Sequence, residues 1–547
     1  MRRRDTKVLG SDKEMLKDLP LTKKAVSKFV TEVNAKSLDD LKEDADELGI
    51  ELNKPPKEQK NELKDLPNTK AGVVLRLPPE PSGYMHLGHA IAGMINFLYK
   101  QEYNGKLWLR FEDTNPRLVK KEFINSFEDG YEWLGIRWDD KKFITPDMDK
   151  IYSFGEKLLK ENKAYVCTCP PDEIKRDRLD GTECKCRGHD IKENLGLFED
   201  AKAGKIPEKK AIVRFKGNMK DRNLSLRDPN LFRIIDTDYD FPWLNRKDKI
   251  KLWPIYDFAN VIEDELCGIT HVLRSSEFKS EFQDVLRSAL GFKKLNVVQF
   301  SRFNFEGTPF SKRKIRGLIK DGFIKDWDDV RLPTVAAIRR RGIQSDAIRD
   351  FVLAVGYSSS HHEYSWDLLF TLNRRIIDQK ANRYFFVSEP TKLTVQDAGE
   401  RIVKLPLHPS SNAGFRTVKT NGKFWIDGKD FVNMKVGDVM RLKDLYTIEI
   451  IEKLDGAVSA KIISVDMLGG EKIIQWVTSE NIKVSIISVG TLLNKDGSFN
   501  TDSLKTINGL AENSIATLSK GDIIQFERFG FCILDNKEMH SFVYISK

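Results

Sequence analysis

The chain has 547 residues, of which 40% are hydrophobic and 32% charged, with a formal net charge of +9. This length predicts about three to five domains, and the composition excludes a disordered chain. The mild positive charge permits a polyanionic partner without requiring one. No apolar run approaches the ~18 residues of a membrane span, and no apolar core follows the arginines near the start, so we expect a cytosolic protein.

Residues 1–70 are rich in lysine, glutamate, aspartate and leucine. The apolar spacing of 37–52 is close to the helical period, and the polar, proline-bearing stretch 53–70 is typical of a linker. We interpret the region as a helical appendage. Two readings stay open: a solubilising extension, or a docking module for a protein partner.

Strand-like and helix-like segments alternate from residue 71 onward. The apolar run 71–78 predicts a buried strand, and after a turn with three prolines and a glycine, 89–105 has helical spacing. A second buried strand is expected at 106–113 and a second helix at 118–134. This order predicts a βαβ unit of a parallel sheet.

Later segments resume the same theme around an insertion. Residues 252–275 combine helix and strand signals, 297–305 predict one strand, and 320–385 are helical. The stretch between about 165 and 250 differs in composition and holds four cysteines, so we interpret it as an insertion into the parallel sheet.

The last third of the chain is β-rich. From about 388, short β-branched runs are broken by turns at a spacing typical of barrels or a sandwich. Asp427-Gly428 is a turn signal between two strand-like flanks.

Two of the eight histidines, His86 and His89, lie between the first predicted strand and helix. A strand that ends in a Gly/Pro turn and enters a helix exposes backbone N–H groups, which bind anions. Imidazole donors beside them suit phosphoryl or nucleotidyl transfer, and Gly88 permits a close approach. Taken alone, the two histidines could equally cap the helix or pack locally.

A second candidate phosphate site is the Gly/Pro-flanked loop 307–317, which carries four basic residues. Ser311 and Lys312 follow a predicted strand, where a basic loop can clamp leaving phosphates. A solvated basic loop is the alternative reading.

Four cysteines lie within 167–186 as two Cys-x-Cys pairs. Structural disulfides are rare in the cytosol, and four thiolates suit tetrahedral Zn²⁺. His189 could replace one of them, and four reduced thiols without metal are the alternative. The expected ligands are Cys167, Cys169, Cys184 and Cys186.

The motifs together carry a family resemblance. "HLGH" at 86–89 resembles the HIGH motif, and "FSKRK" at 310–314 the KMSKS loop, of class I aminoacyl-tRNA synthetases. "RLPPEPSGYMHLGHA", "LRFEDTNP", "WPIYDFANVIED" and "SRFNFEGTPFSKRKI" resemble the glutamyl/glutaminyl branch in its archaeal and eukaryotic form. "VGDVMRLKDLYTIEI" and "GDIIQFERFGF" are similar to its anticodon-binding half. Leu87 replaces the HIGH isoleucine, and only Ser311-Lys312 of the KMSKS core is kept.

The resemblance implies ATP-dependent ligation of L-glutamate to tRNA(Glu) through a glutamyl-adenylate, with Mg²⁺ bound to the ATP. It implies that His86 and His89 stabilise the α-phosphate and that Lys312 holds the pyrophosphate side. The implied ATP-binding residues are Pro79, Glu80, Gly83, His86, Gly88, His89, Ser275, Arg302, Phe303, Ser311 and Lys312.

The amino acid is decided by fewer residues. The resemblance implies that the pocket is lined by Arg76, Glu80, Tyr256 and an acidic residue at 112–113, either Glu112 or Asp113. The side-chain carboxylate of a glutamate substrate needs a cation as its partner. This chain has Arg274, and it resembles glutamyl enzymes in having arginine at this position. The alternative is that Arg274 forms a structural ion pair with Glu277 or another internal carboxylate.

The implied architecture is multidomain α/β plus β. The expected segments are a helical appendage and linker at 1–70, the first half of a Rossmann-type catalytic domain at 71–165, an acceptor-stem-binding insertion with the zinc site at 166–250, the second catalytic half at 251–319, a helical connecting subdomain at 320–387 and β-barrel anticodon-binding domains at 388–547.

The tRNA is expected to lie across several of these segments, with phosphate contacts from Arg339, Arg340 and Arg341. We expect a monomer, with the N-terminal appendage as a possible contact for a protein partner. A glutaminyl-tRNA synthetase and a catalytically silent tRNA-binding paralogue are the two alternatives.

Overall fold

The chain divides into two compact units, residues 1–62 and 63–547. The computed structural model describes six positions between 28 and 40 and the ranges 63–237, 249–278, 281–358, 362–410 and 413–547. The predicted N-terminal helix therefore lies almost wholly outside the described residues. Within these ranges, no helix is both long and apolar enough to cross a membrane.

A parallel sheet begins the second unit, as the sequence predicts. β1 (Val74–Leu77), β2 (Lys106–Phe111) and β3 (Asp140–Phe143) pair in that order, all parallel. Between them run α4 (Leu87–Glu102) and α5 (Lys121–Trp133). The expected βαβ unit is confirmed.

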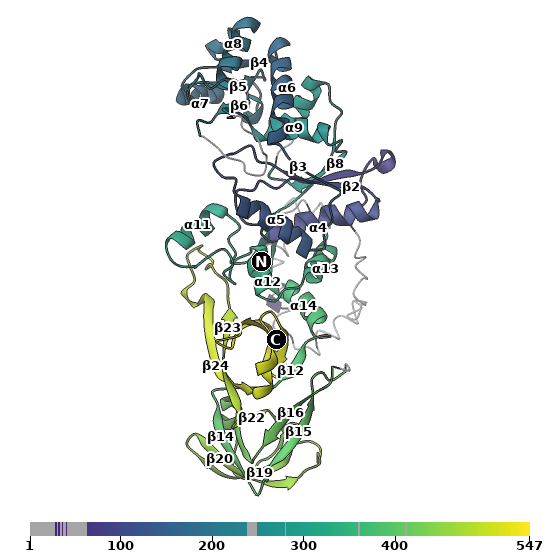
Figure 1. Cartoon of the computed structure of the whole chain (residues 1–547), viewed down its shortest axis with the longest axis vertical. Coiled ribbons are helices and arrows are strands. Elements are labelled where there is room, and N and C mark those ends of the chain that lie inside the picture. Colours follow the sequence, from purple (N-terminus) through teal and green to yellow (C-terminus); the bar gives the residue numbers. More distant parts are fainter. Residues whose placement is uncertain are drawn as a thin grey trace. The chain divides into compact units, whose positions relative to one another are not determined.

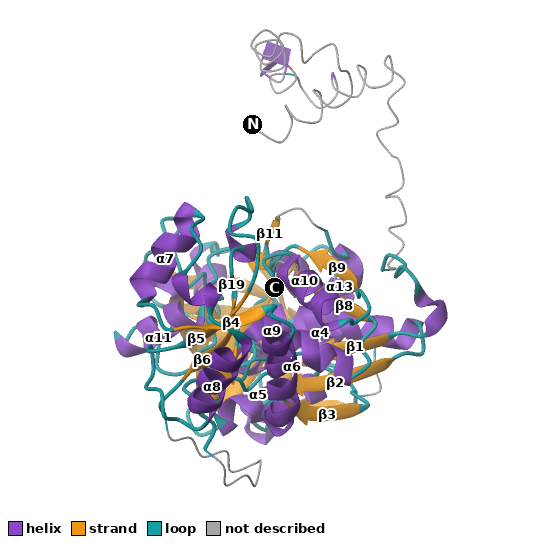
Figure 2. Cartoon of the chain, turned by 90° about the horizontal axis from the view of Figure 1, so that it is seen from above, coloured by secondary structure: helices purple, strands orange, loops and turns teal. Residues whose placement is uncertain are grey.

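Two later strands extend this sheet. β8 (His271–Ser275) and β9 (Asn296–Phe300) are parallel partners, and the N–H of Thr270 donates to the carbonyl of Val74, 3.1 Å between N and O. Figure 2 shows the resulting succession β3, β2, β1, β8, β9. β1, β2 and β3 are parallel to one another and β8 is parallel to β9, and ligands bind at the carboxyl ends of such strands.

Helix α4 covers the sheet because its apolar residues recur at helical spacing. Leu87, Ala90, Ile91, Met94 and Ile95 are all buried, and they share one hydrophobic core with the strand residues. The helix therefore begins at the edge formed by the carboxyl ends of the strands, and packing fixes its first turn.

The segment between β3 and β8 forms an antiparallel sheet of four strands with helices around it. Its elements are α6 (Met148–Lys160), β4 (Ala164–Cys167), α7 (Pro171–Asp180), α8 (Ile191–Lys202), β5 (Ile212–Phe215), β6 (Asn230–Ile234), β7 (Leu252–Pro254) and α9 (Tyr256–Leu266). This sheet has its own core, which α6, α9 and α10 (Glu281–Leu290) share.

The single strand predicted at 297–305 is wrong. The chain leaves β9 at Phe300, where the N–H of Ser301 donates to the carbonyl of Ser358. It resumes as β10 (Phe303–Phe305), which pairs with β11 (His362–Tyr364) instead. The sequence of an apolar run does not show where the chain changes from one strand partner to another.

The predicted helical region follows. Its helices are α12 (Val335–Arg340), α13 (Ser345–Val355) and α14 (Trp366–Ile377), and α11 (Lys312–Lys320) directly precedes the region.

The β-rich last third is confirmed. One seven-stranded sheet has the order β12-β25-β26-β27-β23-β24-β13. Its edge strands β12 (Asn382–Tyr384) and β13 (Phe386–Ser388) are separated by one residue, so the sheet nearly closes into a barrel. Its other strands are β23 (Asn481–Val489), β24 (Leu504–Glu512), β25 (Ile523–Phe526), β26 (Gly530–Asn536) and β27 (Ser541–Ser546).

A second seven-stranded sheet has the order β21-β18-β19-β20-β14-β17-β22. Its strands are β14 (Thr391–Gln396), β17 (Lys423–Ile426), β18 (Val439–Leu442), β19 (Thr447–Leu454), β20 (Ala457–Ser464), β21 (Lys472–Ile474) and β22 (Trp476–Thr478), and β15 (Arg401–Pro406) pairs separately with β16 (Phe415–Thr420). The predicted turn at Asp427-Gly428 is instead the start of α15 (Gly428–Val432), because the Asp427 carboxylate accepts the N–H of Lys429 as an N-cap.

Candidate active site

A cavity of about 840 Å³ opens at the carboxyl ends of β1, β2 and β8. Its volume lies in the range of small-molecule and cofactor sites. Among the residues that line it are Arg76, Pro79, Glu80, His86, Gly88, His89, Glu112, Tyr256, Arg274, Ser275, Arg302, Phe303, Ser311 and Lys312. Residues from both halves of the parallel sheet and from the basic loop therefore meet in one place.

The two histidines stand at the start of α4. His86 is the residue before the helix, and its neighbours are fixed by backbone bonds: Leu87 donates to the carbonyl of Pro333 at 2.8 Å. The rings of His86 and His89 stack, with 3.7 Å between their centroids. Burial and the charge of Lys312 lower the pKa of His86 to about 3. Both rings are thus neutral hydrogen-bonding groups at pH 7.

Lys312 enters the cavity from the first turn of α11. Its Nζ donates to the Oγ of Ser82 at 2.7 Å and lies 4.0 Å from a carboxylate oxygen of Glu80. Gly83 makes room for the lysine stem, because a Cβ there would lie 2.8 Å from the Cδ of Lys312. Burial lowers the pKa of Lys312, with Glu80 acting in the opposite direction.

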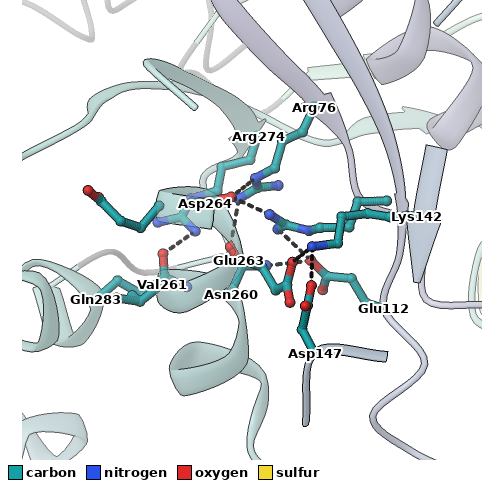
Figure 3. A network of polar contacts seen from close by, with 12 residues as sticks. Arg76, Glu112, Lys142, Asp147, Asn260, Val261, Glu263, Asp264, Arg274 and Gln283 are labelled. Atoms are coloured by element: carbon teal, nitrogen blue, oxygen red, sulfur yellow. Dashed lines mark hydrogen bonds and ion pairs between the residues drawn. The ribbon is translucent and has the colours of Figure 1, made fainter. Parts of the chain in front are cut away.

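A buried polar network joins β1 and β2 to α9 (Figure 3). The carboxylate of Asp264 lies 2.7 Å from both Arg76 Nε and Arg110 Nη1. Glu112 accepts from Arg110 at 3.0 Å and from Asn260 at 2.5 Å. Burial opposes ionisation of Asp264, but the two arginines outweigh it and lower its pKa.

The pKa of Glu112 is shifted in the opposite direction from that of Asp264. Burial raises the pKa of Glu112 to about 7, against the opposing pull of Arg110 and Arg76. Tyr256, the first residue of α9, lies close enough to Glu112 to sense its charge, and burial raises the tyrosine pKa. The cavity thus contains one carboxyl group whose charge responds to pH near neutrality.

Arg274, on β8, lines the cavity and is 7% exposed. Its Nη1 donates to the Oε1 of Gln283 at 2.8 Å. Its Nε and Nη2 are buried and have no hydrogen-bond acceptor in the part of the chain that is described. Glu277 pairs with Arg302 instead, so the structural ion pair between Arg274 and Glu277 is excluded. Buried donors are nearly always satisfied in proteins, so these two N–H groups are available to a ligand that enters the cavity or to water.

The four cysteines of 167–186 meet beside β4. Their sulfur atoms all lie within 4.8 Å of one another, and none forms a disulfide. The Sγ of Cys169 is 3.2 Å from that of Cys184 and 3.7 Å from that of Cys186. Tetrahedral zinc with Zn–S of about 2.3 Å needs sulfur atoms about 3.8 Å apart, so the cluster fits the ion. His189 lies outside this cluster and faces Glu193.

A family model described as "tRNA synthetases class I (E and Q), catalytic domain" matches residues 72–379. Two models of the anti-codon binding domain of the same group match 381–467 and 473–535. The chain belongs to this class I synthetase family.

Archaeal relatives are similar over nearly the whole chain. The glutamate--tRNA ligase of Nitrosopumilus maritimus is 36% identical over 98% of this chain and 94% of its own length. That of Methanocaldococcus jannaschii is 35% identical over 95% and 91% of the two chains, and that of Pyrococcus furiosus 35% over 97% and 93%.

One residue expected in the synthetase pocket is not there. Asp113 does not line the cavity, because its carboxylate accepts the N–H groups of Ile144 and Thr145 at 3.0 and 3.1 Å and the hydroxyl of Thr145. Of the two acidic alternatives, Glu112 is the one at the site. Gly83 lies just outside the lining, against Lys312.

Sequence reasoning missed four residues that hold the cavity-lining side chains in place: Arg110, Asn260, Asp264 and Gln283. Asn260 and Asp264 follow Tyr256 at intervals of four on α9. Residues repeated at that spacing share one face of a helix, and an amide and a carboxylate placed on the same face as Tyr256 are a usable signal. Gln283 had no such signal.

The arginines expected to contact phosphates are engaged within the chain. Arg340 forms two 2.7 Å bonds to the carboxylate of Asp535, and the guanidinium of Arg341 lies 4.6 Å from the ring centroid of Phe370. Arg339 also has an internal partner, the carboxylate of Asp129 at 3.5 Å. The phosphate contacts expected from Arg339, Arg340 and Arg341 stay a prediction.

Proposed function

We propose that the protein ligates L-glutamate to tRNA(Glu), using ATP with Mg²⁺, through a glutamyl-adenylate. One observation carries the choice of amino acid: the Nε and Nη2 of Arg274 are buried in the cavity wall with no acceptor among the described residues. A planar guanidinium binds a carboxylate with two parallel hydrogen bonds. The side-chain carboxylate of glutamate supplies that partner, whereas the neutral amide of glutamine does not.

The other end of the amino acid would lie against Glu112. Ionised Glu112 pairs with the substrate ammonium, and the hydroxyl of Tyr256 can hydrogen-bond there without adding charge. Arg76 lines the same cavity, held by Asp264 and Asn260. Glu80 completes this group of expected glutamate-binding residues at the cavity wall.

In the first step, an oxygen of the α-carboxylate of glutamate attacks the α-phosphorus of ATP, and the bond from that phosphorus to pyrophosphate breaks. The neutral imidazoles of His86 and His89 donate hydrogen bonds to the α-phosphate oxygens as charge develops there. Lys312 holds the departing pyrophosphate, and Mg²⁺ neutralises phosphate charge when bound. A hydroxyl of the terminal adenosine of tRNA then attacks the carbonyl carbon, and AMP leaves.

The remaining ATP contacts would come from residues around these three. We assign them to Pro79, Gly83, Gly88, Ser275, Arg302, Phe303 and Ser311.

The tRNA would bind along the chain segments expected from the sequence. A second cavity of about 530 Å³ in the insertion is lined by Lys175, Arg178 and Arg233, and it supports an acceptor-end site at 166–250. We assign the anticodon to 388–547 and structural Zn²⁺ to the four clustered cysteines. A cytosolic monomer is the form that we propose.

The test is pyrophosphate exchange and tRNA charging with glutamate or glutamine, with and without tRNA. We expect glutamate-dependent exchange and glutamyl-tRNA. Preferential charging of glutamine would establish the glutaminyl alternative, and binding of tRNA without exchange or charging would establish the silent paralogue.

A further inference from the structure

Gln283, at the start of α10, sits between two charged side chains and is 7% exposed. Its Oε1 accepts from Arg274 at 2.8 Å, and its Nε2 donates to a carboxylate oxygen of Asp257 at 2.9 Å. Arginine can only donate, and an ionised carboxylate can only accept. Only one orientation of the amide satisfies both neighbours, so Asp257 fixes the amide oxygen toward Arg274.

The other buried arginines of the site are held differently. Arg76 and Arg110 each lie 2.7 Å from the carboxylate of Asp264, which compensates their charge. Arg274 has an amide in the corresponding place, and Asp257 stands one side chain further back. The site thus gives carboxylate partners to Arg76 and Arg110 and a neutral partner to Arg274, whose Nε and Nη2 have no acceptor among the described residues.

A neutral anchor has a consequence for binding. A carboxylate in direct contact with Arg274 would offset its charge and repel a second carboxylate brought in by a ligand. An amide orients the guanidinium by one hydrogen bond and leaves its charge uncompensated. The Nε and Nη2 groups then stay available to an incoming anion.

We propose that Gln283 is a positioning residue that determines specificity for an acidic amino acid. Its amide holds Arg274 in place and separates it from Asp257. The positive charge of Arg274 is therefore available to the side-chain carboxylate of the substrate. This inference rests on the proposed glutamate activity and deepens it.

The first test is Gln283→Glu, which changes shape little and places a carboxylate against Arg274. The KM for glutamate, measured by tRNA charging, should rise about 10- to 100-fold, the effect of losing a charge-assisted bond. The kcat and the KM for ATP should stay within about twofold, because the phosphate residues are untouched. Unchanged KM for glutamate in a folded variant would overturn the proposal.

A second pair of variants separates positioning from packing. Gln283→Met removes the amide, so Arg274 can turn to Asp257, and the KM for glutamate should again rise. Adding Asp257→Asn removes that competing carboxylate and should return the KM most of the way toward the wild-type value. A raised KM that the second change leaves unaltered would mean that Gln283 acts by packing, which overturns the inference.

Failure of the proposed glutamate activity can be told apart from failure of the role of Gln283. If the wild-type protein does not charge glutamate, the substrate assignment fails before any variant is compared. Glutamate charging by wild type with no response to Gln283→Glu or Gln283→Met rejects the role of Gln283 alone.

Discussion

The backbone N–H of Leu493 donates to the carbonyl oxygen of Gly307, with 3.1 Å between N and O. Leu493 belongs to the connection between β23 and β24, and Gly307 begins the loop that carries Lys312. The contact continues where Lys314 Nζ donates to the carbonyl of Gly497 at 3.0 Å. In Figure 1, β23 and β24 reach toward α11. The connection between two strands of the C-terminal sheet thus contacts the loop to which we assign the phosphates.

Leu492→Ala tests whether this contact with the loop matters for catalysis. Leu492 is 1% exposed and packs with Ile315 and Leu318 of α11. Its truncation should weaken that packing by about 2–5 kcal/mol and loosen Lys312. Glutamate-dependent pyrophosphate exchange should then slow more than the KM for glutamate changes.

The matched control is Leu442→Ala, a fully buried leucine in the core of the other C-terminal sheet. It should lower the melting temperature comparably and leave the KM for ATP unchanged. Equal exchange kinetics in the two variants would show that the β23–β24 connection has no special effect on the loop.

Arg274→Ala tests the substrate assignment directly. Losing a two-bond carboxylate contact should lower kcat/KM for glutamate about 10²- to 10⁴-fold. The melting temperature should not fall, because the removed guanidinium has two buried nitrogens without a partner in the described chain. Arg349→Ala, an exposed position on α13, is the control and should behave as wild type. Wild-type glutamate kinetics in Arg274→Ala would reject the assignment.

Short motifs made much of this site predictable. His86, His89 and Lys312 could be found because strand, turn and helix signals surround them, and a parallel sheet gathers such turns at one edge. The sequence could not separate Glu112 from Asp113. Neighbouring residues at a strand end point to opposite faces, and Asp113 is turned to Ile144 and Thr145, which follow β3 and lie 31 and 32 positions away.

The unpredicted residues share a physical reason. Asp264 acts on Arg76 and Arg110, which lie 188 and 154 positions earlier in the chain. Gln283 acts on Arg274 from a separate element. Such contacts are created only when distant segments pack, and local periodicity carries no record of the partner.

The KM for glutamate should depend on pH near neutrality. Glu112 has a pKa of about 7, so it loses its charge as pH falls through that value. A neutral carboxyl no longer pairs with the substrate ammonium, and the KM should therefore rise between about pH 8 and pH 6. His86, with a pKa of about 3, stays neutral throughout and adds no titration of its own.

Glu112→Gln provides the comparison for this profile. Its KM for glutamate should be raised and nearly flat over the same pH range, because the titrating group is gone. Asp113 has a pKa of about 6 but its carboxylate is occupied by Ile144 and Thr145. A pH dependence that persists in Glu112→Gln would assign the titration to another group.

Purified protein should contain one zinc ion per chain, measured by elemental mass spectrometry after preparation without chelator. Cys184→Ser should lose the ion, because its sulfur lies 3.4 Å from that of Cys167 and 3.2 Å from that of Cys169. Binding energy of a structural zinc contributes to folding, so this variant should melt lower and charge tRNA poorly. Cys267→Ser, outside the cluster, should retain the metal. Wild-type protein without zinc would establish the alternative, four reduced cysteines that bind no metal.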